Sequence, residues 1–298
     1  MQSKIQNKRA ELKKIISRIN NLPSPPIVLQ QMNKIISNPY SSAIDIASIV
    51  SEDPSMTARV LRVTNSAYYG LPREITSVKQ AVVYIGLETL KNIILSTSIM
   101  GAFGKRKDDD GEYVNHFWRH SLAVAFLSRI ISRISRPSDI AFQEDSFSAG
   151  LLHDIGKIIL YSHLPDVYQQ KIKLMEDDSL CEYTAETIII GCSHCELGLF
   201  LTEMWNLPKP IQDSVTFHHN PSDVPQEGLL PSIVHLADQL THSAEFLNVY
   251  GASLETTALY GDVWAKVNIQ PEMRRNLIDS LASEYEKSET FLNLANVC

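Results

Sequence analysis

The chain has 298 residues and a formal charge of −7, with 27 Lys and Arg against 34 Asp and Glu. This acidic balance argues against DNA binding, because contacts with the phosphate backbone require a surplus of basic side chains. No apolar run approaches the roughly 20 residues that span a bilayer, so we expect no transmembrane segment. The N-terminus lacks a signal-peptide core, so we do not expect secretion. Four cysteines are too few for a disulfide framework and predict reduced thiols in the cytoplasm.

Apolar residues recur at helical spacing along the chain, while alternating strand patterns and hairpin signals are rare. Residues 1–20 place apolar side chains at this spacing opposite a basic face, which predicts an amphipathic helix. A second helical pattern starts at Pro25 and Pro26. The sequence therefore predicts an all-α protein.

Capping signals mark the next helices. Asp53 followed by Pro54 fits an N-cap with proline at the first helical position. Ser77 fits another N-cap, and Gly86 predicts a break before a further apolar-patterned helix.

The stretch Gly101–Gly111 is the best candidate for a boundary, because it combines glycines with opposed charge blocks and offers no face to bury. It predicts two lobes, 1–110 and 111–298, the second ending in C-terminal helices. Within the second lobe, helical patterns cover residues 113–135, 140–155, 164–176, 180–205 with a break near Gly191, 208–219 and 230–245.

All nine histidines lie beyond residue 115, which indicates that only the second lobe carries histidine chemistry. The most informative segment is AGLLHDIGK, residues 149–157, in which His153 and Asp154 are adjacent. Adjacent residues on a helix are about 100° apart, yet both side chains can reach an ion that lies close to the helix. Imidazole together with carboxylate suits Mn, Fe, Zn or Ni. The alternative is a core imidazole beside a helix-end cap.

Other helices supply the same ligand types. His116 and His120 share a helix face at spacing i, i+4, and Asp238 lies three residues after His235. Two other segments supply three further histidines, which are His194, His218 and His219. Side chains on facing helices can converge inside a helical bundle, so the set as a whole favours a metal site.

The order His120, then His153 and Asp154, then Asp238 resembles the H…HD…D signature of the HD superfamily of helical, metal-dependent phosphohydrolases. The first half resembles the narrower HDOD (HD-related output domain) family through LPSPPIVLQQMNKIISNP, DP at 53–54, NSAYYG at 65–70 and IGL at 85–87. The resemblance covers about residues 20–245. It implies a two-lobed helical protein with an HD-like bundle, acting in bacterial signal transduction with a signalling protein as partner.

Many HDOD members have lost the HD ligands, but this chain keeps a set similar to the metal centre of the HD-GYP phosphodiesterases. The resemblance implies a dinuclear Fe, Mn or Zn site with Asp154 as the bridge. It also places Lys157 near a phosphate, as a catalytic residue with Asp154 if the protein is an enzyme. The expected first ligand set is His120, His153, Asp154 and Asp238; the second is His194, His218 and His219. Outer groups should orient the imidazoles, and His116 or His235 could serve there instead of binding the metal directly.

Two departures from HD-GYP proteins argue against hydrolysis of cyclic di-GMP. The segment HHNPSDVPQEG, residues 218–228, has no GYP signature, and His116 replaces a typical Glu. Two functions stay open: a regulatory module, or a phosphohydrolase acting on a nucleotide or another phosphorylated small molecule. A structural zinc site at Cys192 and Cys195 is a further alternative to buried free thiols.

Overall fold

The computed structural model describes residues 43–103, 112–178, 180–225, 228–244 and 261–295. In these ranges the regular structure consists of α-helices and short 3-10 helices, without a strand, which confirms the predicted all-α class. No helix among the described residues is long and apolar enough to cross a bilayer. The patterns predicted over 1–20 and from Pro25 lie outside these ranges, as do residues 104–111 of the expected boundary.

The first four described helices are α3 (Ala43–Glu52), α4 (Pro54–Thr64), α5 (Val78–Ile85) and α6 (Leu87–Ala102). Their boundaries follow the predicted signals. The Asp53 carboxylate accepts backbone N–H bonds at the start of α4, and the Ser77 hydroxyl accepts one from Gln80 at the start of α5. Gly86, with φ of 81°, separates α5 from α6.

The remaining helices, with the short 3-10 helices η1 and η3, are α7 (Glu112–Ser135), α8 (Ile140–Leu152), α9 (Ile155–His163), α10 (Pro165–Asp178), α11 (Glu182–Ile190), α12 (His194–Met204), α13 (Lys209–Phe217), η1 (Pro221–Asp223), α14 (Leu229–His242), α15 (Gly261–Lys266), η3 (Pro271–Met273) and α16 (Arg274–Ala295). Two boundaries differ from the prediction. The helix expected over 140–155 ends at Leu152, and α9 occupies a segment to which no helix was assigned.

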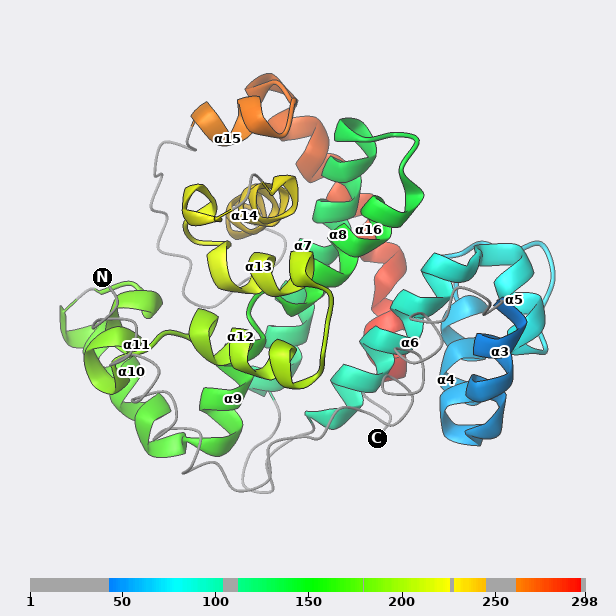
Figure 1. Ribbon diagram of the computed structural model, residues 1–298, viewed down its shortest axis with the longest axis horizontal. Helices are drawn as coiled ribbons and strands as arrows, with labels where there is room; N and C mark the ends of the chain where they lie inside the picture. Colours follow the sequence, from blue (N-terminus) through cyan, green and yellow to red (C-terminus); the bar gives the residue numbers. More distant parts are fainter. Residues whose placement is uncertain (1–42, 104–111, 179, 226–227, 245–260, 296–298) are drawn as a thin grey trace.

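Helix α7 lies at the centre of the molecule and packs along α8, α14 and α16 (Figure 1). Helices α3, α4 and α5 lie to one side of it, and α6 joins them to the rest by packing on α8. One cluster of buried apolar side chains runs through both halves of the chain. Because α16 packs on α4 and α6 as well as α7, the last helix also contacts the first lobe. The division near residues 101–112 stays a prediction.

Two glycines allow the close helix contacts that position the histidines. A Cβ atom on Gly156 would lie 1.9 Å from the carbonyl oxygen of His194, so glycine lets the start of α9 touch the start of α12. A Cβ atom on Gly150 would lie 2.8 Å from the Ala125 Cα and the Val124 oxygen, which brings α8 against α7. Both glycines thus allow segments that carry histidines to lie close together.

Candidate metal centre

The structure brings the seven predicted ligands together from five parts of the fold. Six of them are buried, and His219 is half-buried. We call this set the histidine–aspartate cluster: His120 on α7, His153 and Asp154 between α8 and α9, His194 opening α12, His218 and His219 after α13, and Asp238 on α14.

An interruption of the helix between α8 and α9 lets His153 and Asp154 face the same centre. The sequence suggested that both lie on one helix, but α8 ends at Leu152 and Asp154 is the residue before α9. The Asp154 side chain makes no capping hydrogen bond to α9. Its carboxylate is directed into the histidines instead, which argues against a purely capping role.

The two carboxylate oxygens of Asp154 face different histidines. The Oδ2 atom lies 3.2 Å from His153 Nε2 and 3.8 Å from His120 Nε2. The Oδ1 atom lies 3.3 Å from His194 Nε2 and 3.4 Å from His218 Nε2. Asp154 therefore lies between the two sets of metal ligands that were expected from the sequence.

The Asp238 carboxylate is a second group that lies close to several imidazoles. Its Oδ1 atom lies 3.1 Å from His120 Nε2 and 3.6 Å from His153 Nε2. His242 Nε2 lies 3.3 Å from the same oxygen, although the sequence analysis did not single it out. The available signal was its position four residues after Asp238 on α14, which places both side chains on one face.

The outer ring nitrogens of two histidines donate hydrogen bonds to backbone carbonyls. His153 Nδ1 donates to the Gly150 carbonyl at 2.7 Å, and His218 Nδ1 donates to the Val215 carbonyl at 3.0 Å. Carbonyl oxygens only accept, so in the neutral tautomer the lone pair lies on Nε2, directed at the carboxylates.

His194 and His235 follow the same pattern. His194 Nδ1 lies 2.7 Å from the carboxylate of Glu186, which is buried and was also not predicted. His235 Nδ1 donates to the carbonyl of His218 at 2.6 Å and so supports the segment that carries a ligand, as expected for a supporting position.

The inward-facing atoms of the cluster have no hydrogen-bond partner among the described residues. These buried atoms include His120 Nε2, His153 Nε2, His218 Nε2, Asp154 Oδ1 and Asp238 Oδ1. Imidazole lone pairs and carboxylate oxygens repel one another unless a cation lies between them. The donor set and its orientation therefore fit a divalent metal ion.

The electrostatics of the cluster show how protons fill the cation role when metal is lacking. Burial opposes the imidazolium form of His218, but Cys195 and Asp154 raise its pKa to about 10. Burial also opposes ionisation of Asp154, yet His153 and Lys157 hold the pKa of that carboxyl well below its usual range. Burial lowers the pKa of His120 to about 4, so this imidazole stays neutral and keeps its lone pairs. Proton and metal compete for the same atoms.

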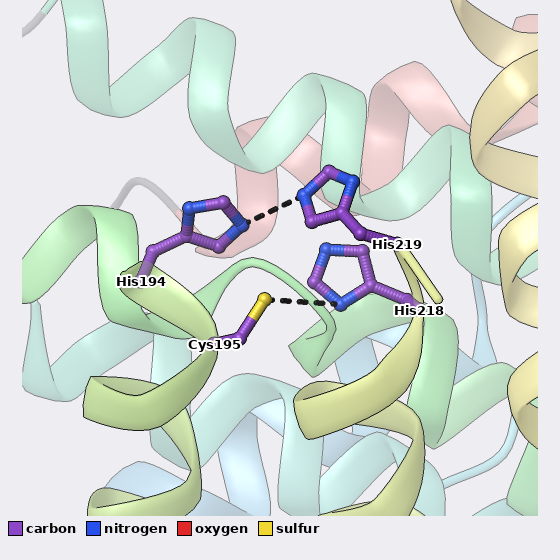
Figure 2. Close-up of side chains that lie close together, drawn as sticks. All are labelled: His194, Cys195, His218 and His219. Atoms are coloured by element: carbon purple, nitrogen blue, oxygen red, sulfur yellow. Dashed lines mark hydrogen bonds between the residues drawn. The ribbon is translucent and has the colours of Figure 1, made fainter. Parts of the chain in front are cut away.

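A sulfur lies beside the second ligand set. Figure 2 shows His194 and Cys195, from the start of α12, facing His218 and His219 after α13, with candidate ligand atoms within 4.8 Å of one another. His194 Nε2 lies 3.0 Å from His219 Nε2, and Cys195 Sγ lies 4.0 Å from His218 Nδ1. Because His218 Nδ1 already faces a carbonyl, the sulfur lies on the outer side of that ring. This group contains neither Cys181 nor Cys192, which argues against the C-x-x-C zinc alternative.

Lys157 and His116 occupy different places relative to the cluster. Lys157 Nζ lies 2.7 Å from Asp154 Oδ2, at the edge of the cluster, and 2.9 Å from Glu182, a partner that the sequence did not reveal. His116 lies one turn before His120 on α7, with its Nε2 atom 3.6 Å from Glu112. The metal-competent groups of described residues leave His116 out.

The fold and the cluster define a helical protein of the HD type with a buried histidine–aspartate centre. Residues 22–221 match the HDOD domain family, and the chain belongs to that family. An uncharacterised protein of Treponema pallidum is 27% identical over 213 residues, which cover 72% of this chain and 40% of the relative. The chain thus matches less than half the length of that protein.

Solved structures of other bacterial proteins have a similar fold. An HDOD domain protein of Geobacter sulfurreducens has a TM-score of 0.75 at 24% identity, covering 95% of this chain and 99% of its own. A candidate phosphohydrolase of Shewanella amazonensis has a TM-score of 0.75 at 21% identity, covering 96% and 98%. A candidate signal transduction protein of Marinobacter aquaeolei has a TM-score of 0.80 at 20% identity, covering 97% and 65%. At these identities the likeness shows a common fold.

Proposed function

We propose that this chain is a signal-transduction protein of the HDOD family that holds divalent metal at the histidine–aspartate cluster. One observation carries the metal site: buried imidazole and carboxylate atoms point at one another without hydrogen-bond partners among the described residues. Such an arrangement is costly in a closed interior and becomes favourable when a cation occupies its centre. Nitrogen and oxygen ligands of this kind suit Fe, Mn or Zn.

The proposal extends to a dinuclear site bridged by Asp154. The observation that supports this bridge is that the two carboxylate oxygens of Asp154 face different sets of histidines. A carboxylate can serve two ions, whereas a neutral imidazole offers a single lone pair. His120, His153 and Asp238 would complete one set, and His194, His218 and His219 the other.

Elemental analysis tests this proposal. We expect the protein expressed with Fe and Mn supplied to contain one to two ions per chain, and Asp154→Ala to lose them. Asp166→Ala, which removes an exposed carboxylate on α10, is the matched control and should retain the metal. Substoichiometric metal in the wild type, with no uptake on adding Fe, Mn or Zn, would show that the cluster persists only for packing.

Hydrolysis of a phosphoester is the second candidate function, and the position of Lys157 favours it. A bound metal pair would supply Lewis acidity and a water of lowered pKa. The Lys157 ammonium, 14% exposed at the edge of the cluster, could attract the phosphoryl oxygens and orient them. A generic phosphodiester such as bis(p-nitrophenyl) phosphate tests this activity with the metal-loaded chain. We expect little turnover of cyclic di-GMP, because the GYP segment is absent after His219.

A further inference from the structure

Lys157 lies between two carboxylates that belong to different parts of the fold. Its Nζ atom is 2.7 Å from Asp154 Oδ2, inside the cluster, and 2.9 Å from Glu182 Oε2 at the start of α11. Both carboxylates lie within hydrogen-bond distance of the same Nζ atom and favour its ammonium form. Lys157 therefore places a positive charge at the edge of the cluster.

Glu182 is fixed from its other side by a buried lysine. Its Oε1 atom pairs with Lys171 on α10, a residue that is only 2% exposed, and the Lys171 ammonium lies 4.6 Å from the ring centre of Tyr168. A buried ammonium requires a countercharge, so Lys171 keeps Glu182 turned inward. Helices α10 and α11 pack on each other at the edge of the molecule (Figure 1).

The Lys157 ammonium lies 2.7 Å from Asp154 Oδ2, an oxygen that a metal ion in the cluster would also contact. Two cations beside one carboxylate oxygen repel each other, and the interior screens that repulsion weakly. Lys157 must therefore withdraw from Asp154 when a divalent ion binds. Glu182 is the carboxylate already placed to receive it, because it contacts the same Nζ atom.

We infer that Lys157 is an internal competitor of the metal ion and that Glu182, held by Lys171, is the positioning residue that draws Lys157 away from Asp154. Metal loading then transfers the ammonium from the cluster to α11 and tightens the contact between the α10–α11 pair and the core. The inference rests on the proposed metal site and adds a regulator to it: any change that moves α11 alters metal affinity.

Two substitutions of opposite sign test the inference on the full chain stripped of metal and titrated with Mn²⁺ alone. Lys157→Met keeps the apolar stem, removes the competing charge and should bind Mn²⁺ about tenfold more tightly. Glu182→Gln leaves Lys157 with Asp154 as its carboxylate and should bind about tenfold more weakly, whereas Glu182→Asp should recover part of the loss. Both are checked for folding by circular dichroism and melting.

An ion pair on α6 provides matched controls. Glu88 and Lys91 form an i, i+3 pair away from the cluster, so Lys91→Met and Glu88→Gln repeat both charge changes without moving the affinity. Equal or weaker binding by folded Lys157→Met overturns the inference, as does unchanged binding by Glu182→Gln, while the metal site itself stands. Failure of the wild type to bind Mn²⁺, Fe or Zn overturns the proposed function and this inference with it.

Discussion

A neutral imidazole offers one lone pair, so the partner of one ring nitrogen decides where the other nitrogen points. In His153 and His218 that partner is a backbone carbonyl three residues earlier, and in His194 it is the Glu186 carboxylate. The two carbonyl contacts are fixed by the preceding helix, and the contact with Glu186 by the packing of α11 against the start of α12. The ligand atoms are therefore oriented before any ion arrives, which lowers the cost of assembling the site.

Metal affinity should rise with pH, because an imidazole that is protonated in the metal-free protein must lose its proton before it can bind an ion. With a pKa of about 10 in the metal-free protein, His218 is protonated throughout the neutral range. Below that pKa, each proton displaced makes the affinity about tenfold higher per pH unit. We expect this slope between pH 6 and 8 in calorimetric Mn²⁺ titrations, with proton release counted from buffers of different ionisation enthalpy. A flat profile without proton release would contradict metal binding by a His218 that is protonated in the metal-free protein.

The sequence allowed the candidate metal ligands to be predicted, but not the side chains that hydrogen-bond to them. His120, His153, Asp154 and Asp238 could be selected because histidine and aspartate are rare inside apolar helical segments and have matching chemistry. Glu186 could not be selected, because an acidic residue on a short helix is ordinarily solvated and only the tertiary fold buries it against His194. Long-range contacts of this kind leave no local pattern.

At the scale of the helices, the turn between α8 and α9 is decisive. It interrupts the helix where His153 and Asp154 occur, so both side chains face the cluster. The sequence analysis missed α9 for a related reason. Its buried residues surround the helix and include Ile155, Leu160 and Tyr161, so no one-sided apolar stripe marked it. Asp53 and Ser77 were predictable, because an N-cap acts on its own helix.

Replacing Gly156 with alanine should separate α9 from α12. The added Cβ atom would meet the carbonyl oxygen of His194, part of a backbone that gives way only if the helix shifts. We expect a loss of about 2 kcal/mol or more in the free energy of unfolding and reduced metal content, measured by denaturant melts and elemental analysis. Gly101→Ala is the control, since its Cβ atom would meet the movable end of the Arg59 side chain. Equal stability of both variants would show that the contact with α12 is loose.

At the scale of the molecule, the cluster is assembled from segments far apart in the chain. Helices α7, α8 and α14 contribute to it and pack on one another, while α16 packs along α7 and reaches α4 and α6. The metal would therefore connect parts of the chain that are distant in sequence. Binding to this folded arrangement, and not to the unfolded chain, adds directly to stability.

Metal should raise the melting temperature of the stripped protein. At a free concentration about 100 times the Kd, binding contributes about 2.7 kcal/mol, which corresponds to a shift of several degrees. Thermal denaturation with Mn²⁺, Fe²⁺ or Zn²⁺, each reversed by a chelator, measures this effect. Asp154→Ala should melt at one temperature with or without metal. An equal shift in both proteins would assign the stabilisation to ions bound elsewhere.

The bonds from His153 and His218 to earlier carbonyls also concern the ends of two helices. Gly150 lies in the last turn of α8 and Val215 in the last turn of α13, where carbonyls lack the amide partners of a helix interior. Each ligand is thus the C-terminal cap of the helix before it. Alanine at either position would fray a helix besides removing a ligand, whereas alanine at His194, whose ring bonds to Glu186, would spare both helix ends. Alanine at His153 or His218 should therefore reduce both metal content and helix content, whereas alanine at His194 should reduce metal content alone.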